Sequence, residues 1–280
     1  MCTKKDVSIS YSFSATDRAA NYGDGVFTTM SVSGGKVALY HRHCQRIIRD
    51  ANRLGIQLND HDVALRIAQE ARILGEGVLK LLVSAGEGGR GYARPEMLKP
   101  QLHFSTAAHP PQYAKQQQHG VTMGCASLSL ALQPALAGIK HLNRLEQVLI
   151  KRELTHQQVQ DLVVMDATGN VAEASAANLF WSHQGKWFTP SLESCGVHGV
   201  MRQFLIDWMT RHGEGVESGN FPLSTLVQAD SVLLCNALMP VLPVRSLVTE
   251  AQTTQYSLSP VHELIHAFQK SYKEEYAPAN

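Results

Sequence analysis

Residues 138–143 of this 280-residue chain are Gly138-Ile139-Lys140-His141-Leu142-Asn143. They follow Pro134 and precede a stretch with apolar residues at helical spacing, so Lys140 lies at the start of a predicted helix among apolar neighbours. Such surroundings lower the pKa of an amine and allow it to act as a nucleophile. A solvated lysine at the start of a helix has the same local sequence, so this segment alone leaves both interpretations open.

A carboxylate occurs in an unfavourable sequence context further along the chain. Glu173 lies within the run of small residues from Val171 to Ala177. Burying a carboxylate there is costly unless a cation or a hydrogen-bond donor meets it. The alternative is an ordinary charge at the edge of a turn.

Two further segments could bind an anion. Gly199-Val200-Met201-Arg202 begins a predicted helix, whose free N–H groups and dipole can hold a phosphate. Every helix has such an end, so this motif is weak by itself. Arg46, in His43-Cys44-Gln45-Arg46, adds an arginine from the first long helix, although His-x-x-Arg is a common pattern.

Taken together, these groups match the needs of one cofactor. Pyridoxal 5'-phosphate requires a lysine for the Schiff base, an acid facing the ring nitrogen, and a helix N-terminus with an arginine for the phosphate. Zinc motifs, a Walker loop and G-x-S-x-G are absent from the sequence, and the glycine-rich segment Gly86–Gly91 lacks a lysine–serine pair. We therefore expect pyridoxal phosphate as the cofactor and no metal.

Composition excludes several classes of protein. With 44% apolar and 18% charged residues the chain is globular, and its length favours two domains. The 25 Lys and Arg balance 24 Asp and Glu, which argues against binding nucleic acid or a membrane surface through bulk charge. A small-molecule partner is expected.

The cellular compartment follows from two further observations. The first residues contain no apolar export segment, and the longest apolar stretch, Ser231–Val244, is too short and interrupted to span a membrane. The five cysteines are scattered without a C-x-x-C pair, which is typical of free thiols in a reducing compartment. We expect a cytoplasmic protein.

Periodicity predicts mixed helices and strands in the first half of the chain. The predicted strands are Val7–Tyr11, Val26–Val32, Lys36–Tyr40, Val78–Ser84 and Gln101–Ala107. Two predicted helices, His41–Leu54 and Asp60–Leu74, lie between the third and fourth of these strands. Residues 109–120 lose all periodicity, as an interdomain linker does. We therefore expect an N-terminal α+β domain over residues 1–112 and a linker over 113–119.

The second half is again mixed. Its predicted elements are strands Val121–Ala126, Leu162–Met165, Val171–Ala174, Asn178–Trp181, Trp187–Thr189 and Val232–Cys235, and helices from Leu142 to about Thr155, Gly199–Arg211 and Val261–Phe268. Without strict β-α-β alternation, the pattern predicts a second α+β domain over residues 120–280, carrying Lys140. The cleft between two such domains is the expected ligand site.

The order of the motifs resembles that of the fold-type IV pyridoxal phosphate enzymes, which include branched-chain and D-amino acid aminotransferases. The motifs are His43-x-x-Arg46, Gly138-Ile139-Lys140-x-Leu142-Asn143, Glu173-x-Ser175-x-x-Asn178-Leu179-Phe180 and Gly199-Val200-Met201-Arg202. The resemblance extends over about Asp17 to Val244. It implies a two-domain α+β fold with the active site between the domains.

Within that group, five motifs are similar to those of the 4-amino-4-deoxychorismate lyases of bacterial folate synthesis. They are Asp17-Arg18-Ala19, Gly23 to Thr29, Gly88-Gly89-Arg90-Gly91-Tyr92, Gly138 to Gln147, and Cys235-Asn236-Ala237-Leu238-Met239-Pro240. The resemblance implies conversion of 4-amino-4-deoxychorismate to 4-aminobenzoate and pyruvate.

The resemblance also implies roles for individual residues. Lys140 would carry the cofactor and move the substrate proton, and Glu173 would face the ring nitrogen. Arg46 and the backbone N–H groups of Val200 and Met201 would hold the phosphate. Met201 stands where the aminotransferases usually carry a threonine, so only its amide contact carries over.

Further implied roles concern the substrate. Thr29 would assist proton transfer, and Arg90 and Tyr92 would bind the substrate carboxylates. Asn236 would contact phosphate or substrate. Members of the family are homodimers in which the partner's loop reaches the active site, so Arg90 would serve either its own subunit or the neighbouring one.

Three alternatives remain at this point. The chain could be a D-amino acid or branched-chain aminotransferase on the same fold, a non-catalytic carrier of pyridoxal phosphate, or a binding module in which Lys140 is structural. Thr29 and the Arg90 loop favour the lyase over the transferase. A carrier would have no use for Glu173.

Overall fold

The computed structural model describes residues 8–9 and 14–276, which form two compact units. Unit 1 contains the described residues up to His109, the short segment Ile139–Asn143, and the described residues from Ser271 to Tyr276. Unit 2 contains Pro110–Gly138 and Arg144–Lys270. Both units combine strands and helices, which confirms the predicted α+β class.

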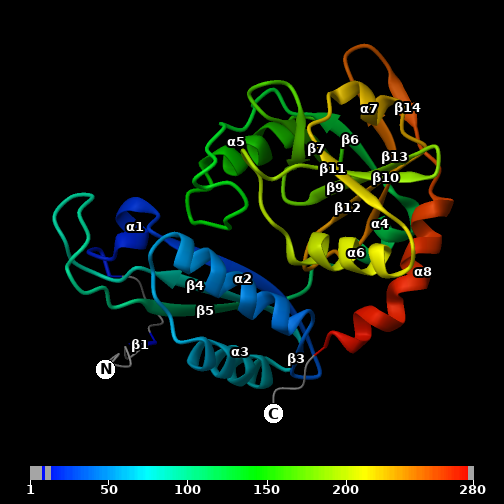
Figure 1. Cartoon of the computed structure of the whole chain (residues 1–280). Coiled ribbons are helices and arrows are strands. Elements are labelled where there is room, and N and C mark those ends of the chain that lie inside the picture. Colours follow the sequence, from blue (N-terminus) through cyan, green and yellow to red (C-terminus); the bar gives the residue numbers. More distant parts are fainter. Residues whose placement is uncertain (1–7, 10–13, 277–280) are drawn as a thin grey trace. The chain divides into compact units, whose positions relative to one another are not determined.

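Unit 1 is built on a five-stranded sheet in the order β1-β5-β4-β2-β3 (Figure 1). Its strands are β1 (Ser8–Ile9), β2 (Gly25–Ser33), β3 (Lys36–Val37), β4 (Gly77–Ser84) and β5 (Gln101–Ala107), and its helices are α1 (Arg18–Tyr22), α2 (Tyr40–Arg53) and α3 (Asp60–Leu74). The predicted strand Val7–Tyr11 coincides with β1 at Ser8–Ile9, and its other positions lie outside the described residues.

The core of unit 1 follows from alternation along the strands. In β2, Val26, Met30 and Val32 are fully buried, whereas Phe27 and Thr29 on the other face are only half-buried. Helices α2 and α3 pack against strands of this sheet and bury one apolar face each. The other face of β2 is therefore available for chemistry.

Unit 2 contains a nine-stranded sheet in the order β11-β10-β9-β12-β13-β6-β7-β8, with β14 paired to β13. The strands are β6 (Val121–Cys125), β7 (Asp161–Met165), β8 (Val171–Ala174), β9 (Asn178–His183), β10 (Lys186–Pro190), β11 (Val216–Gly219), β12 (Ser231–Cys235), β13 (Leu242–Val248) and β14 (Thr253–Gln255). The helices that begin in this unit are α4 (Tyr113–His119), α5 (Leu145–Leu154), α6 (Val200–Arg211), α7 (Leu223–Val227) and α8 (Ser259–Glu274).

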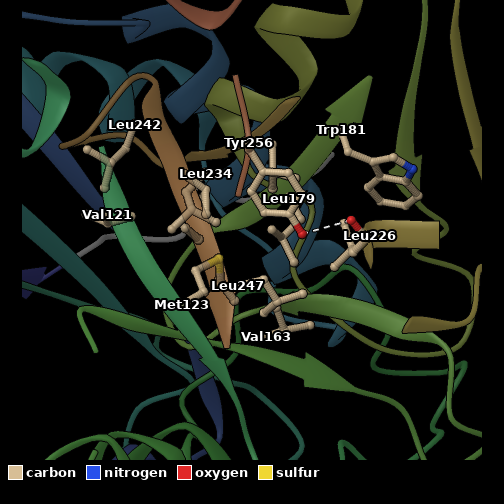
Figure 2. Close-up of a cluster of buried hydrophobic side chains, with 14 of the residues drawn as sticks. Val121, Met123, Val163, Leu179, Trp181, Leu226, Leu234, Leu242, Leu247 and Tyr256 are labelled. Carbon is tan, nitrogen blue, oxygen red and sulfur yellow. Dashed lines mark hydrogen bonds between the residues drawn. The ribbon is translucent and has the colours of Figure 1, made fainter. Parts of the chain in front are cut away.

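Large apolar side chains from the central strands fill the core of unit 2 (Figure 2). Leu179 and Trp181 of β9 and Leu234 of β12 are at most 1% exposed. The buried Tyr256 satisfies its hydroxyl by donating to the Leu226 carbonyl at 2.8 Å. This core fixes the strands from which the unit 2 site residues project.

The domain boundaries differ from the expected ones in two places. The expected linker, residues 113–119, is helix α4, which packs on β13, and Gln117 Nε2 donates to the Val241 carbonyl at 2.8 Å. Residues 139–143, expected in the second domain, belong to unit 1 because their backbone pairs with the start of β2.

Two further findings concern the cysteines and the helices. Cys44, Cys125, Cys195 and Cys235 are free thiols, and Cys2 lies outside the described residues. Across residues 8–9 and 14–276, the helices are too short or too polar to cross a membrane.

Candidate active site

The backbone of Lys140 is fixed on both sides by unit 1. Its N–H donates to Asp50 Oδ2 at 3.0 Å, and its carbonyl accepts from the Phe27 N–H, also at 3.0 Å. The Leu142 N–H donates to the Gly25 carbonyl at 3.0 Å, which continues the pairing with β2. The segment therefore forms an added antiparallel edge on β2, and the lysine is held where its side chain reaches the half-buried face of that strand.

One face of the unit 1 sheet brings together the groups expected to act on the substrate. The Lys140 ammonium nitrogen lies 4.4 Å from the centroid of the Phe27 ring. Thr29 lies on the same face of β2 as Phe27, because side chains two residues apart share a face. The structure thus places the predicted nucleophile and the predicted proton-transfer hydroxyl on one surface.

Lys80 on β4 also lies on this face and was not predicted. Its register partner on β2 is Thr29, and its ammonium nitrogen lies 5.0 Å from the same Phe27 ring. The sequence signal that could have identified it is a single charged residue inside the apolar strand Gly77–Ser84, because charged side chains are rare in buried strands unless they have a partner or a function. Two amines therefore face the ring of Phe27.

The opposite face of β2 holds the predicted phosphate-binding arginine. Arg46 is 5% exposed and donates through Nη2 to the hydroxyl of the fully buried Thr28. That hydroxyl also bonds His43 Nδ1 at 2.6 Å. Burial and the positive charges of Arg46 and Lys140 hold the pKa of His43 well below its usual range, so the imidazole is neutral and both cations lie near it.

Unit 2 carries the predicted acid. Glu173 lies on β8, is 5% exposed, and accepts from the Val197 N–H at 3.0 Å. Gln147 of α5 donates to its other oxygen at 3.5 Å. These donors meet the requirement for burying a carboxylate in a run of small residues, and they fix its orientation.

Helix α6 begins at the predicted phosphate-binding motif. Gly199 is its N-cap, and Val200 and Met201 form its first turn, where helix geometry leaves the N–H groups without intrahelical acceptors. A Cβ at Gly199 would lie 2.1 Å from Asn178 Oδ1, so any larger residue there would have to displace the Asn178 side chain. The helix end is therefore closely packed beside Asn178, with its amide groups positioned to bind an anion.

Asn236 builds the turn after β12. Its Oδ1 accepts from the N–H groups of Leu238 and Met239 at 2.9 and 2.8 Å, and its Nδ2 donates to the Ala176 carbonyl at 3.1 Å. The side chain thus ties this turn to the loop after Glu173. Arg90 and Tyr92 lie on the loop between β4 and β5 in unit 1, and both are exposed, Tyr92 to 88%.

Each unit carries groups of the kinds that pyridoxal phosphate requires. Lys140, Arg46 and Thr29 come from unit 1, and Glu173, Val200, Met201 and Asn236 come from unit 2. An amine, a buried carboxylate, a buried guanidinium and a helix N-terminus are the groups that this cofactor requires. In the described part of the chain, His43 Nε2 in unit 1 and Gln147 Oε1 in unit 2 are each buried without a hydrogen-bond partner, as is expected of a buried polar atom that bonds a ligand or water.

Comparison with known proteins gives three further findings. The family model described as amino-transferase class IV matches residues 25–247. The chain is 36% identical to a protein of Vibrio harveyi named aminodeoxychorismate lyase, over 82% of this chain and 86% of that protein. It is 23% identical to a D-alanine aminotransferase of Listeria monocytogenes, over 90% of this chain and 88% of that protein.

A solved structure shows the same likeness. The crystal structure of 4-amino-4-deoxychorismate lyase from Pseudomonas aeruginosa superposes with a TM-score of 0.88 at 33% identity. The match covers 93% of this chain and 96% of that one.

Proposed function

Because the chain belongs to the class IV amino-transferase family, we propose that it is a pyridoxal phosphate-dependent lyase that converts 4-amino-4-deoxychorismate to 4-aminobenzoate and pyruvate, a step of folate biosynthesis. The family match confirms the resemblance predicted from the order of the motifs. The observation that carries the proposed reaction is the 36% identity to a protein named aminodeoxychorismate lyase, against 23% to an aminotransferase.

The proposed roles distribute binding over both units. Arg46 and the N–H groups of Val200 and Met201 hold the cofactor phosphate, and Glu173 holds a proton at the ring nitrogen. When bound, the cofactor supplies an electron sink for the charge left on the substrate after proton removal. Asn236 shapes the turn that borders the phosphate or the substrate.

The chemistry on the substrate is one proton removal and one bond cleavage. Lys140 takes the proton from the ring carbon that bears the amine. The C–O bond of the neighbouring enolpyruvyl ether then breaks, the ring becomes aromatic, and the departing group takes up a proton to become pyruvate. Thr29 relays a proton in this step, a role supported by its position on the face of β2 that the Lys140 side chain approaches.

Cations on unit 1 are suited to the two substrate carboxylates. Lys80 faces Phe27 beside Thr29, and Arg90 can bind a carboxylate bidentately, with Tyr92 next to it on the same loop.

We further propose a homodimer in the cytoplasm. The exposed apolar side chains of Leu145 (77%) and Val148 (59%) on α5 are suited to a protein interface, and free thiols are typical of a reducing compartment.

The decisive test follows pyruvate. Purified protein loaded with pyridoxal phosphate and given 4-amino-4-deoxychorismate, with no keto acid added, is expected to release pyruvate and 4-aminobenzoate in equal amounts. A preparation that releases no pyruvate but exchanges amino groups between D- or branched-chain amino acids and 2-oxoglutarate is an aminotransferase instead.

Thr29→Ala is expected to lower kcat by about 100-fold and change KM by less than about threefold, because a proton-relay hydroxyl acts in the transition state more than in substrate binding. Steady-state kinetics of pyruvate release measure both constants. Ser31→Ala is the matched control, because it removes a hydroxyl from the same face of β2 two residues farther along. Equal effects of the two substitutions would argue against the relay.

A further inference from the structure

Arg18 is a buried cation with no assigned role. It is 3% exposed, lies in α1, and pairs through Nε with Asp24 Oδ2 at 2.8 Å. Its remaining donors point at one loop, the glycine-rich segment between β4 and β5, which lies beside α1 (Figure 1). The carbonyl groups that accept from its Nη1 and Nη2 are those of Gly88 (3.2 Å), Gly91 (3.4 Å), Tyr92 (2.9 Å) and Ala93 (3.1 Å).

This arrangement determines how the loop presents its side chains. Four carbonyl dipoles within six residues turn toward one guanidinium, so the loop backbone curls around Arg18. Arg90 and Tyr92, carried on that curl, are exposed. Tyr92 also packs edge-on against Tyr22, with ring centroids 5.5 Å apart, and the Arg18 guanidinium lies 5.0 Å from the Tyr22 ring.

The backbone of the loop lies so close to the Arg18 guanidinium that a larger side chain at Gly89 would disturb the contact. Gly89 has φ +87°, and a Cβ there would lie 2.1 Å from the Ala93 carbonyl oxygen and 3.1 Å from Arg18 Nη1. The Arg18 N–H also donates to the Gly86 carbonyl at 2.9 Å. A lysine could not replace the arginine, because one ammonium cannot reach Asp24 and the carbonyl groups at once.

We propose that Arg18 is a positioning residue, which holds the loop of residues 86–93 in the conformation that presents Arg90 and Tyr92 to the carboxylates of the substrate. The proposal rests on the proposed function, in that these two side chains bind substrate. It adds that their placement depends on a guanidinium that does not itself touch the substrate.

Two measurements on Arg18→Lys test the proposal. The first is independent of activity: between Leu81 and Pro100 trypsin can cut only after Arg90, because Arg94 and Lys99 precede prolines. We expect cleavage at Arg90–Gly91 to accelerate about tenfold or more when the loop loses these hydrogen bonds. The second is kinetic: KM should rise about tenfold and kcat should stay within about threefold.

Arg94→Lys is the matched control. Arg94 pairs with the same Asp24 at 2.5 Å but otherwise donates to the Leu54 carbonyl and not to the loop. It is expected to leave loop cleavage and KM near their wild-type values. Equal effects of both substitutions would show that Arg18 acts only through its ion pair with Asp24, and would overturn the proposal.

Gly89→Ala disturbs the same contact from the loop side, should Arg18→Lys fail to fold. It is expected to raise KM and cleavage as Arg18→Lys does, whereas Gly34→Ala, at another positive φ but with open space around it, should not. Unchanged cleavage and KM in folded Arg18→Lys or Gly89→Ala would overturn the proposal. A third outcome is faster cleavage with unchanged KM, together with unchanged KM in Arg90→Ala. It would support the conclusion that Arg18 fixes the loop conformation, and it would contradict the part of the proposed function in which the loop binds substrate.

Discussion

Lys140→Ala is expected to abolish covalent attachment of pyridoxal phosphate and to lower turnover by about 1,000-fold or more. The lysine is proposed to serve twice, as the amine that binds the cofactor and as the base that moves the substrate proton, and each role alone contributes orders of magnitude. Wild-type protein should show a visible absorption band that borohydride fixes to the chain, and peptide mass mapping should place the adduct on Lys140.

Lys80→Ala is the matched control for this experiment. Its amine lies 5.0 Å from the same Phe27 ring that Lys140 approaches to 4.4 Å, so proximity alone does not separate the two. The sequence context does: Lys140 lies in the motif Gly138-Ile139-Lys140-x-Leu142-Asn143, which resembles the cofactor-lysine segment of the family, whereas Lys80 lies inside β4. Lys80→Ala should keep the fixed adduct. An adduct on Lys80 in the Lys140→Ala protein would show that the wrong amine has been assigned.

Local signals predicted most regular elements of unit 1 closely, but helix α1 was not predicted, and the strand expected over Lys36–Tyr40 ends at Val37. Helix α3 begins and ends at the predicted residues, Asp60 and Leu74, because Asn59 caps its first turn and Gly75 ends it at a positive φ. Helix α5 was predicted from Leu145, Val148 and Leu149, yet these residues are exposed by 77%, 59% and 40%. Periodicity therefore identified an apolar face, but it could not tell what that face packs against.

The site was predictable only where a motif marks it. Lys140, Glu173 and Gly199 were predicted from the order of their motifs along the chain, because the local context of each is weak by itself. Lys80 and Arg18 gain their importance from partners distant in sequence: Lys80 from its register opposite Thr29, and Arg18 from carbonyl groups 70 to 75 residues away. Strand register and loop curvature arise from tertiary packing, so no local pattern encodes them.

Helix α4 shows the same limit in the fold. Residues 113–119 are Tyr-Ala-Lys-Gln-Gln-Gln-His, with no apolar period, and the segment was expected to be a linker. It is helical where it packs on β13, with bonds from Gln117 to the Val241 carbonyl and between the Gln117 carbonyl and His262. Tertiary contacts thus stabilise a helix that the local sequence does not indicate.

Glu173→Gln is expected to lower turnover by about 100-fold to 10,000-fold while the cofactor remains bound and coloured. The carboxylate is proposed to hold a proton at the ring nitrogen, and only the protonated ring withdraws electrons strongly from the reacting carbon. A neutral amide has nearly the same shape and can still accept from the Val197 N–H, which donates to Glu173 at 3.0 Å. The loss should therefore be electronic and appear in kcat, with little change in the melting temperature.

Asp161→Asn separates this effect from the general loss of a buried carboxylate. Asp161 lies on the neighbouring strand β7, is 8% exposed, and accepts from the N–H and hydroxyl of Ser175. Its neutralisation should alter stability and leave kcat within about threefold, because it contacts Ser175, Leu162 and Lys151, none of which has a proposed role in the reaction. Stopped-flow absorbance of the loaded enzymes, followed as substrate is mixed in, should show a slowed proton-removal phase only in Glu173→Gln. If the two variants lose turnover equally, or if Glu173→Gln loses none, Glu173 does not act at the ring nitrogen.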